Sequence, residues 1–139
     1  MDQNIYQSVK GMTAAEATCK EGGVIIDVSS CSDGHGGEDF YNNLKKATSL
    51  QKAMDEILAR GRNETVFDQW EAQILMRMLL RFTIIMVTEA PKQMIEDMHM
   101  KNASSIEEAL SMAKDVLAEK GVKEPKITVI PDGVSVIVK

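Results

Sequence analysis

The chain has 139 residues and a formal net charge of −5, with 44% hydrophobic and 27% charged residues. This length suits one domain with a buried core, and the acidic balance argues against nucleic-acid binding, which usually shows as a basic stripe. The most apolar stretch, residues 74–87, is interrupted by Arg77 and Arg81, so no membrane span is predicted. Because the first residues do not show a secretory-signal pattern and only two cysteines are present, we expect a reduced, cytoplasmic setting.

The first half of the chain predicts helices around one buried strand. A helix is expected over residues 4–12, and a capping-box pattern at Thr13 and Glu16 predicts a separate helix that ends at the glycines 22–23. Residues 23–30 then have the apolar composition of a buried strand. They are followed by a glycine-rich turn over 31–37 and a helix over 38–47.

The second half continues this alternation: helices are expected over residues 49–61, 66–80, 90–98 and 104–121, and a second buried strand over 81–89. Asp68 and either Ser104 or Ser105 are candidate helix N-caps. A Pro-Asp-Gly turn within residues 126–139 predicts a strand on each side of it. The alternation predicts a single α/β domain over residues 1–139, built as a three-layer α/β/α sandwich with a mainly parallel sheet.

The first helix has an unusual polar face. Ile5, Val9 and Met12 share one side at helical spacing, whereas Tyr6, Gln7 and Lys10 lie away from it. A phenol, an amide and an ammonium together could hold an anionic, oxygen-rich ligand, since lysine supplies charge and the other two supply hydrogen bonds. Periodicity by itself favours the simpler interpretation, a solvated polar face that happens to carry a tyrosine.

Trp70 repeats this pattern in the helix over 66–80. The expected core stripe of that helix is Ala72, Leu75, Met76 and Leu79, and Trp70 lies off it, on the side of Arg77 and Arg81. A tryptophan beside arginines outside the core often marks an interface. A tryptophan covered by a neighbouring loop is the equally weighted alternative.

The glycine-rich turn over residues 31–37 lies between a strand and a helix, as phosphate-binding loops do. It fits neither the dinucleotide fingerprint nor the P-loop, because Asp39 stands where the former needs a glycine and the turn has no lysine. Glu38 and Asp39 would also repel a phosphate at the helix start. A structural role or a domain contact is therefore the preferred interpretation.

The histidines and cysteines do not form a recognisable catalytic or metal motif. Zinc needs about four ligands, whereas Cys31 and His35 offer at most two and His99 has no obvious ligand neighbour. A Ser-His-Asp set could be drawn from the serines and Asp33 near His35, but no nucleophile-elbow motif is present. We expect no metal site and no catalytic triad from this chain.

Four stretches together resemble the C-terminal domain of the nickel-pincer-dependent lactate racemase family: NIYQSVKGMTAAEA, GGVIIDVSSCSDGHGGEDFY, QWEAQILMRMLL and VIPDGVSVIV. The resemblance covers nearly the whole chain in order. It implies a two-domain parent protein with its active site between the domains. There, a nickel-carrying pyridinium nucleotide would take a hydride from the α-carbon of a 2-hydroxy acid and return it to the opposite face, while two histidines exchange the hydroxyl proton.

The resemblance assigns substrate-binding roles to four residues of this chain. Its Tyr-Gln-x-x-Lys stretch matches Tyr6, Gln7 and Lys10, and a tryptophan of a later helix matches Trp70. Lys10 and Gln7 would bind the substrate carboxylate or keto oxygen, and the two aromatic residues would line the cleft. The cofactor lysine, the nickel ligand and the paired acid–base histidines would belong to the N-terminal domain, so no catalytic residue is expected here.

The expected partners are therefore the N-terminal domain of the same parent protein and a small 2-hydroxy acid. The chain is expected to be a piece that continues on both sides in the parent and is inactive by itself. Two alternatives remain open: a stand-alone interaction or small-ligand domain that presents the same four residues to a partner, and a nucleotide-binding domain that rests on fold analogy.

Overall fold

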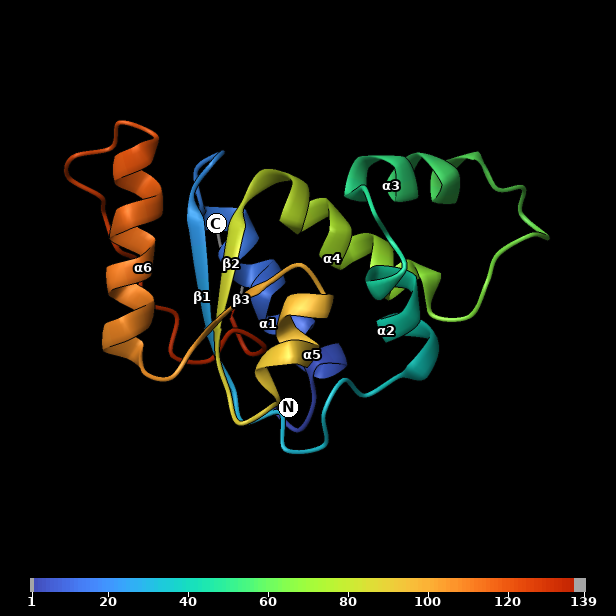
Figure 1. The fold of residues 1–139 in the computed structure, drawn as a ribbon, viewed down its shortest axis with the longest axis horizontal. Coiled ribbons are helices and arrows are strands. Elements are labelled where there is room, and N and C mark those ends of the chain that lie inside the picture. The colour runs from blue at the N-terminus through green and yellow to red at the C-terminus, as the bar shows by residue number, and fades with distance from the viewer. Residues whose placement is uncertain (1, 137–139) are drawn as a thin grey trace.

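The computed structural model describes residues 2–136 and has three layers (Figure 1). The middle layer is a parallel three-stranded sheet in the order β1-β2-β3, made of β1 (Val24–Val28), β2 (Thr83–Val87) and β3 (Lys101–Ala103). This arrangement confirms the predicted α/β sandwich. No helix within residues 2–136 is long and apolar enough to cross a membrane.

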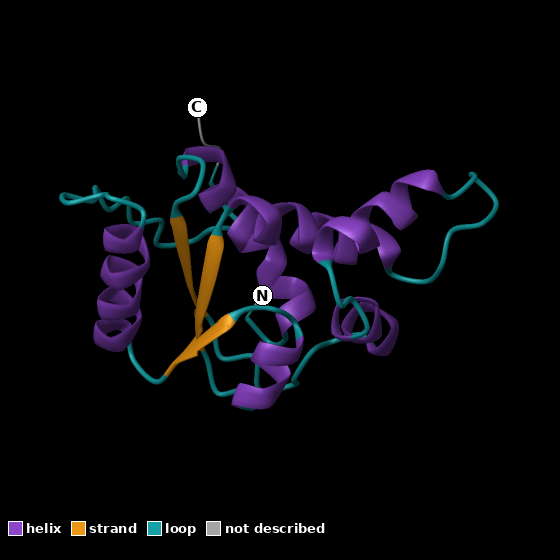
Figure 2. Cartoon of the chain, turned by 45° about the horizontal axis from the view of Figure 1, so that its top comes forward, coloured by secondary structure: helices purple, strands orange, loops and turns teal. Residues whose placement is uncertain are grey.

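Helices cover both faces of the sheet. The helix α6 (Ile106–Glu119) packs alone on one face, and α1 (Ile5–Thr18), α4 (Gln69–Arg81) and α5 (Lys92–Asp97) lie on the other side. Two further helices, α2 (Glu38–Lys45) and α3 (Leu50–Ala59), pack against α4 and extend the molecule away from the sheet. Figure 2 shows the loop between α3 and α4 projecting from this end.

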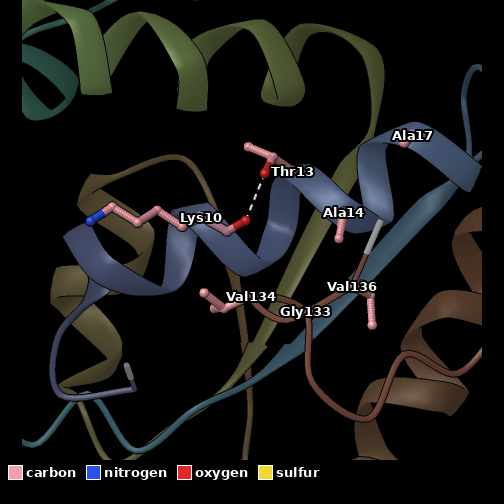
Figure 3. Close-up of a pocket in the computed structure, with 7 residues that line it drawn as sticks. All are labelled: Lys10, Thr13, Ala14, Ala17, Gly133, Val134 and Val136. Carbon is pink, nitrogen blue, oxygen red and sulfur yellow. Dashed lines mark hydrogen bonds between the residues drawn. The ribbon is translucent and has the colours of Figure 1, made fainter. Parts of the chain in front are cut away.

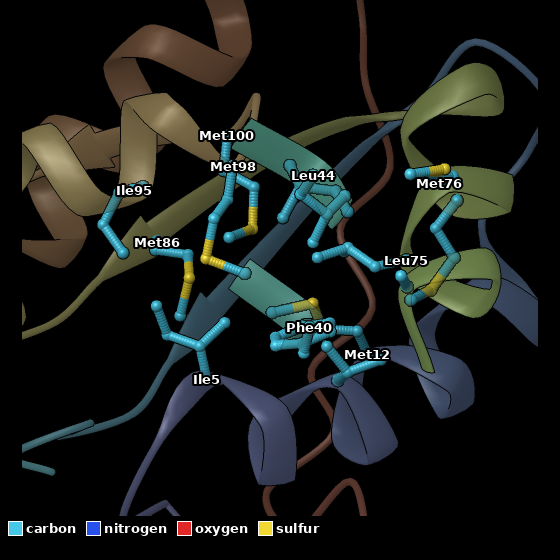
Figure 4. Packing of buried hydrophobic residues seen from close by; sticks show 14 of the residues in the cluster. Ile5, Met12, Phe40, Leu44, Leu75, Met76, Met86, Ile95, Met98 and Met100 are labelled. Carbon is cyan, nitrogen blue, oxygen red and sulfur yellow. The ribbon is translucent and has the colours of Figure 1, made fainter. Parts of the chain in front are cut away.

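The core has two parts because side chains alternate across the sheet. Along β2, Ile84 and Met86 enter the larger part, whereas Ile85 packs on the other side with the small alanines of α6. Methionines fill much of the larger part between the helices, as Figure 4 shows (Met12, Met76, Met86, Met98 and Met100). Flexible, unbranched side chains suit the irregular gaps between helices of different orientation.

The start of the chain forms one helix, so the prediction of two helices separated at residue 13 is wrong. The N-cap is Asn4, whose side chain accepts a hydrogen bond from the Gln7 backbone N–H at 3.0 Å. Thr13 is not a cap: its hydroxyl donates to the Lys10 carbonyl at 2.6 Å within the helix. Glu16 does not reach back to Thr13 but forms an ion pair with Arg77 at 2.6 Å.

The predicted strands around the Pro-Asp-Gly turn are not found in the described part of residues 126–139, which ends at 136. The Asp132 carboxylate instead accepts hydrogen bonds from the Val134 and Ser135 backbone N–H groups, which makes a local turn. None of the three strands pairs with the described part of this segment, so its apolar residues do not form a strand there although the sheet has two edges. The sequence pattern also missed β3, whose three residues begin with a lysine and an asparagine.

Candidate functional site

The polar face of α1 lies beside the buried one, as predicted. Ile5, Val9 and Met12 are at most 1% exposed, whereas Lys10 is exposed and Tyr6 and Gln7 are half-buried. The Lys10 ammonium donates a hydrogen bond to the Gln7 side-chain oxygen at 2.7 Å. The amide nitrogen of Gln7 and the remaining ammonium protons are thus available as a group of donors on one turn of helix.

Trp70 joins this group through Tyr6. The two rings meet edge to face with centroids 5.9 Å apart, and Tyr6 packs in the same manner against the buried Phe40 at 5.3 Å. Trp70 is 52% exposed, so no loop covers it among the described residues. We call the set Tyr6, Gln7, Lys10 and Trp70 the α1–α4 face, because the structure brings these four predicted residues together.

The arginines that follow Trp70 along α4 do not belong to this face. Arg77 and Arg81 both form ion pairs with Glu16 of α1, at 2.6 and 2.9 Å, and Arg81 also binds Glu21. These pairs fasten α4 to the C-terminal half of α1. The two arginines that the sequence pattern grouped with Trp70 therefore pair with the carboxylates of Glu16 and Glu21, and they do not account for the exposure of Trp70.

Asp68 orients the Tyr6 hydroxyl, which lies 3.4 Å from the Asp68 carboxylate. Asp68 is the N-cap residue of α4, as predicted, but its backbone is left-handed (φ 54°) and its side chain makes no capping hydrogen bond. Partial burial raises the pKa of Tyr6, and the negative charges of Asp68 and Glu71 raise it further. Tyr6 therefore remains a protonated hydrogen-bond donor at neutral pH.

The glycine-rich turn holds the start of α1. The backbone N–H groups of Ile5 and Tyr6 donate to the carbonyls of Gly34 and His35 at 3.0 and 3.1 Å. These are N–H groups that a helix cannot satisfy internally. The carbonyl oxygens of the turn thus accept hydrogen bonds from the first turn of α1. Because a phosphate is bound by N–H donors, this geometry supports the structural interpretation over phosphate binding.

The side chains that could have formed a metal or nucleophile site have other partners. Ser29 donates to Asp27 at 2.6 Å and lies 3.3 Å from the Cys31 sulfur, while His35 stacks on Tyr41 and its Nδ1 accepts from the Gly37 N–H. Within residues 2–136, no three His, Cys, Asp or Glu residues lie close enough to hold a metal ion.

A groove of about 350 Å³ runs between α1 and the segment 133–136 (Figure 3). It is lined by Lys10, Thr13, Ala14, Ala17, Gly133, Val134 and Val136. In Figure 3 the Lys10 nitrogen points away from Gly133 and Val136. The groove therefore offers mainly small and apolar groups.

Sequence reasoning missed two carboxylates next to the α1–α4 face. Asp68 was considered only as a cap, and Glu71 was not considered at all, although it is 1% exposed on α4. A helical-wheel pattern marks buried positions by apolar residues, so a buried carboxylate carries no signal of this kind. The sequence does offer one indication of Asp68 and Glu71: they lie on either side of Trp70 along the chain.

The fold and the α1–α4 face define a class of protein: an α/β domain that exposes polar and aromatic groups on one face. The profile of the family described as "Lactate racemase C-terminal domain" matches residues 1–138, so the chain belongs to this family.

Two relatives carry the name lactate racemase. The chain is 54% identical over 140 aligned positions to the protein of Thermoanaerobacterium thermosaccharolyticum and 48% identical to that of Lactiplantibacillus plantarum. Each alignment covers 100% of this chain but only 32% of the relative. The solved lactate racemase apoprotein of T. thermosaccharolyticum matches 99% of this chain, and 32% of its own length, with a TM-score of 0.93.

Proposed function

We propose that residues 1–139 form a single domain that makes one wall of the substrate cleft of a lactate-type 2-hydroxy-acid racemase. The observation that carries the proposal is the α1–α4 face, where an exposed ammonium, an amide, a phenol and an indole lie side by side. The identity of 48–54% to two proteins named lactate racemase supports it.

The four residues have distinct proposed roles. Lys10 and Gln7 bind the carboxylate or keto oxygen of the substrate, because an ammonium and an amide already linked at 2.7 Å present several N–H donors to one anion. Tyr6 and Trp70 line the cleft and exclude water, which strengthens the attraction between Lys10 and the substrate. None of the four is required to accept a proton or a hydride.

The acid–base groups and the cofactor are proposed to lie on the preceding domain of the parent protein. The resemblance implies a nickel-pincer nucleotide, whose chemistry when bound is the removal and return of a hydride at the substrate α-carbon. Within residues 2–136, no three His, Cys, Asp or Glu side chains are grouped so that they could hold a metal ion by themselves. The proposed contribution of this chain is substrate binding.

The partner that covers the α1–α4 face is proposed to be that same preceding domain. Phe67, next to this face on the α3–α4 loop, is 82% exposed, and Trp70 is 52% exposed. Exposed aromatic residues of this size commonly mark an interface, and the chain spans only 32% of the length of its named relatives. A stand-alone interaction domain would present the same four residues to a partner, but the identity to two much longer proteins named lactate racemase favours a preceding domain of the same protein.

The two cysteines support a proposed cytoplasmic setting for the protein. Cys19 and Cys31 are both free thiols, and Cys31 is buried. Free thiols persist where the surroundings are reducing.

The proposed function is tested by comparing the full-length parent protein with the 139-residue chain. The cofactor-loaded parent should interconvert D- and L-lactate, whereas the chain should show no turnover when the same cofactor is added, because the acid–base histidines and the cofactor site are proposed to lie on the preceding domain. Chiral chromatography of the product mixture measures both. Turnover by the chain alone would refute the division of roles, and a loaded parent that leaves lactate unchanged would refute the proposed substrate class.

A further inference from the structure

Two residues of the glycine-rich turn lie directly against Tyr6. The His35 carbonyl accepts a hydrogen bond from the Tyr6 backbone N–H at 3.1 Å. A Cβ at Gly37 would lie 3.4 Å from the Tyr6 ring and 3.2 Å from the Asp68 carboxylate, so the backbone of Gly37 is close to both. Because that carboxylate accepts from the Tyr6 hydroxyl, a shift of the turn would displace the backbone of Tyr6, its ring and the partner of its hydroxyl together.

The backbone of this turn has little stiffness of its own. Residues 34, 36 and 37 are glycines, and Gly34 and Gly36 have φ +72° and +80°. Glycine loses more conformational freedom on folding than any other residue, so such a segment depends on outside contacts to stay in a single arrangement. Within residues 34–37, only His35 has a side chain that can make such contacts.

The His35 side chain reaches across the turn. Its Nδ1 accepts a hydrogen bond from the Gly37 N–H at 3.2 Å. Its ring stacks on Tyr41 of α2, with centroids 4.8 Å apart and planes 7° apart, and the Tyr41 hydroxyl donates to the Asp97 carboxylate of α5. The imidazole is therefore seated on α2 while its nitrogen holds the residue that lies against Tyr6.

The surroundings of the imidazole also suit the form that this contact needs. An acceptor at Nδ1 places the single proton of a neutral imidazole on Nε2. The Nε2 atom of His35 lies 3.4 Å from the Glu38 carboxylate, which accepts hydrogen bonds. Glu38 thus favours the tautomer in which Nδ1 is free to accept from Gly37.

We propose that His35 is a positioning residue for Tyr6, because its Nδ1 fixes Gly37 and its carbonyl fixes the Tyr6 N–H, so that the Tyr6 ring stands at the wall of the substrate cleft. This inference rests on the proposed function, in which Tyr6 lines that cleft. Since Tyr6 is not required to take a proton or a hydride, its displacement is expected to weaken lactate binding and to raise KM more than it lowers kcat.

The first measurement is hydrogen exchange of the peptide that spans the start of α1, in the full-length, cofactor-loaded parent protein. His35→Phe keeps a ring that can stack on Tyr41 and removes the acceptor for Gly37. The amides of Ile5 and Tyr6 should then exchange about tenfold faster, because the carbonyls that hold them are released. His35→Asn should restore slow exchange, since an asparagine side-chain oxygen accepts from the N–H two residues on.

The second measurement is the kinetics of lactate racemisation by the same variants. His35→Phe should raise KM about fivefold and leave kcat within about twofold, whereas His35→Asn should leave both within about twofold of the unmodified protein. Tyr6→Ala should raise KM by itself. In the Tyr6→Ala background, His35→Phe should have no further effect on KM, because the two residues act through one contact.

Gly121→Ala is the control for a general loss of stability. Gly121 also has φ +80°, but it follows α6 on the other face of the sheet, and no atom lies within 4 Å of where its Cβ would be. Its substitution should lower Tm through backbone strain. It should leave the exchange at Tyr6 and KM unchanged, so a KM that follows Tm across all variants would indicate a merely structural role for His35.

The outcomes separate the two proposals. If Tyr6→Ala raises KM but His35→Phe leaves the exchange or KM unchanged, or adds its full effect in the Tyr6→Ala background, the positioning role is refuted and the proposed function stands. Failure of His35→Asn to restore either quantity refutes the role of Nδ1. If Tyr6→Ala itself leaves KM unchanged, the cleft role of Tyr6 is refuted, and the role of His35 with it.

Discussion

Replacing Lys10 with alanine in the full-length, cofactor-loaded parent protein is expected to lower kcat/KM for lactate about 100-fold while the fold stays intact. A hydrogen bond to a charged group contributes about 1.5–3 kcal/mol, and a 100-fold loss corresponds to about 2.7 kcal/mol. The fold should tolerate the change because Lys10 is exposed and its side chain bonds only to Gln7 among the described residues.

Lys114→Ala is the matched control for this substitution. Lys114 is also an exposed helical lysine, but it lies on α6, which covers the opposite face of the sheet. It should leave kcat/KM unchanged, so a loss shared by both variants would indicate a general effect of charge on the anionic substrate. Unchanged turnover in the Lys10 variant would mean that the polar side of α1 is solvated surface.

Replacing Gly36 with alanine is expected to lower the free energy of unfolding by about 2–4 kcal/mol, the sum of left-handed strain and a lost helix cap. Gly36 has φ +80°, and an added Cβ would lie 2.4 Å from the side-chain oxygen of Asn4. That oxygen accepts the Gln7 N–H at the start of α1. The substitution should therefore both strain the turn and displace the cap that fixes the α1–α4 face.

Gly121→Ala separates the two contributions. Gly121 has the same φ of +80°, but no atom lies within 4 Å of where its Cβ would be. Its substitution should cost only the backbone strain, about 1–2 kcal/mol. Urea unfolding of both variants measures the difference; equal losses would mean that the contact between Gly36 and Asn4 is relieved at no cost.

The helical faces could be predicted from the sequence because burial on a helix follows a simple period. Ile5, Val9 and Met12 are buried as expected, and so are Ala72, Leu75 and Met76 of α4, while the fourth expected member, Leu79, is partly buried. The same period placed the polar residues of α1 and Trp70 outside the core. It could not show that Tyr6 and Trp70 meet, because their contact joins two helices far apart in the chain.

The errors have a common cause in tertiary structure that overrides local signals. Glu16 fits a capping box, yet it pairs with arginines of α4, so α1 continues through Thr13. Asp68 occupies the N-cap position of α4 as predicted, yet its carboxylate makes no cap bond and lies at the Tyr6 hydroxyl instead. The apolar pattern after residue 126 looks like two strands, yet no sheet edge meets its described part.

The chemistry of the site came from resemblance rather than from pattern. Nothing in the spacing of Tyr6, Gln7 and Lys10 distinguishes a substrate-binding face from a solvated one. The structure adds the Lys10–Gln7 hydrogen bond and a buried Glu71 carboxylate whose Oε1 has no partner among residues 2–136. The family match over residues 1–138 shows that the chain is a C-terminal domain, which supports the proposal that a preceding domain covers the α1–α4 face.

The most direct test of the central claim is a crystal structure of the full-length, cofactor-loaded parent protein with lactate bound. The account predicts the lactate carboxylate within about 3 Å of the Lys10 ammonium, with Gln7 beside it and Tyr6 and Trp70 on the wall of the cleft. Lactate bound beyond the reach of both Lys10 and Gln7, with the α1–α4 face open to solvent, would contradict it.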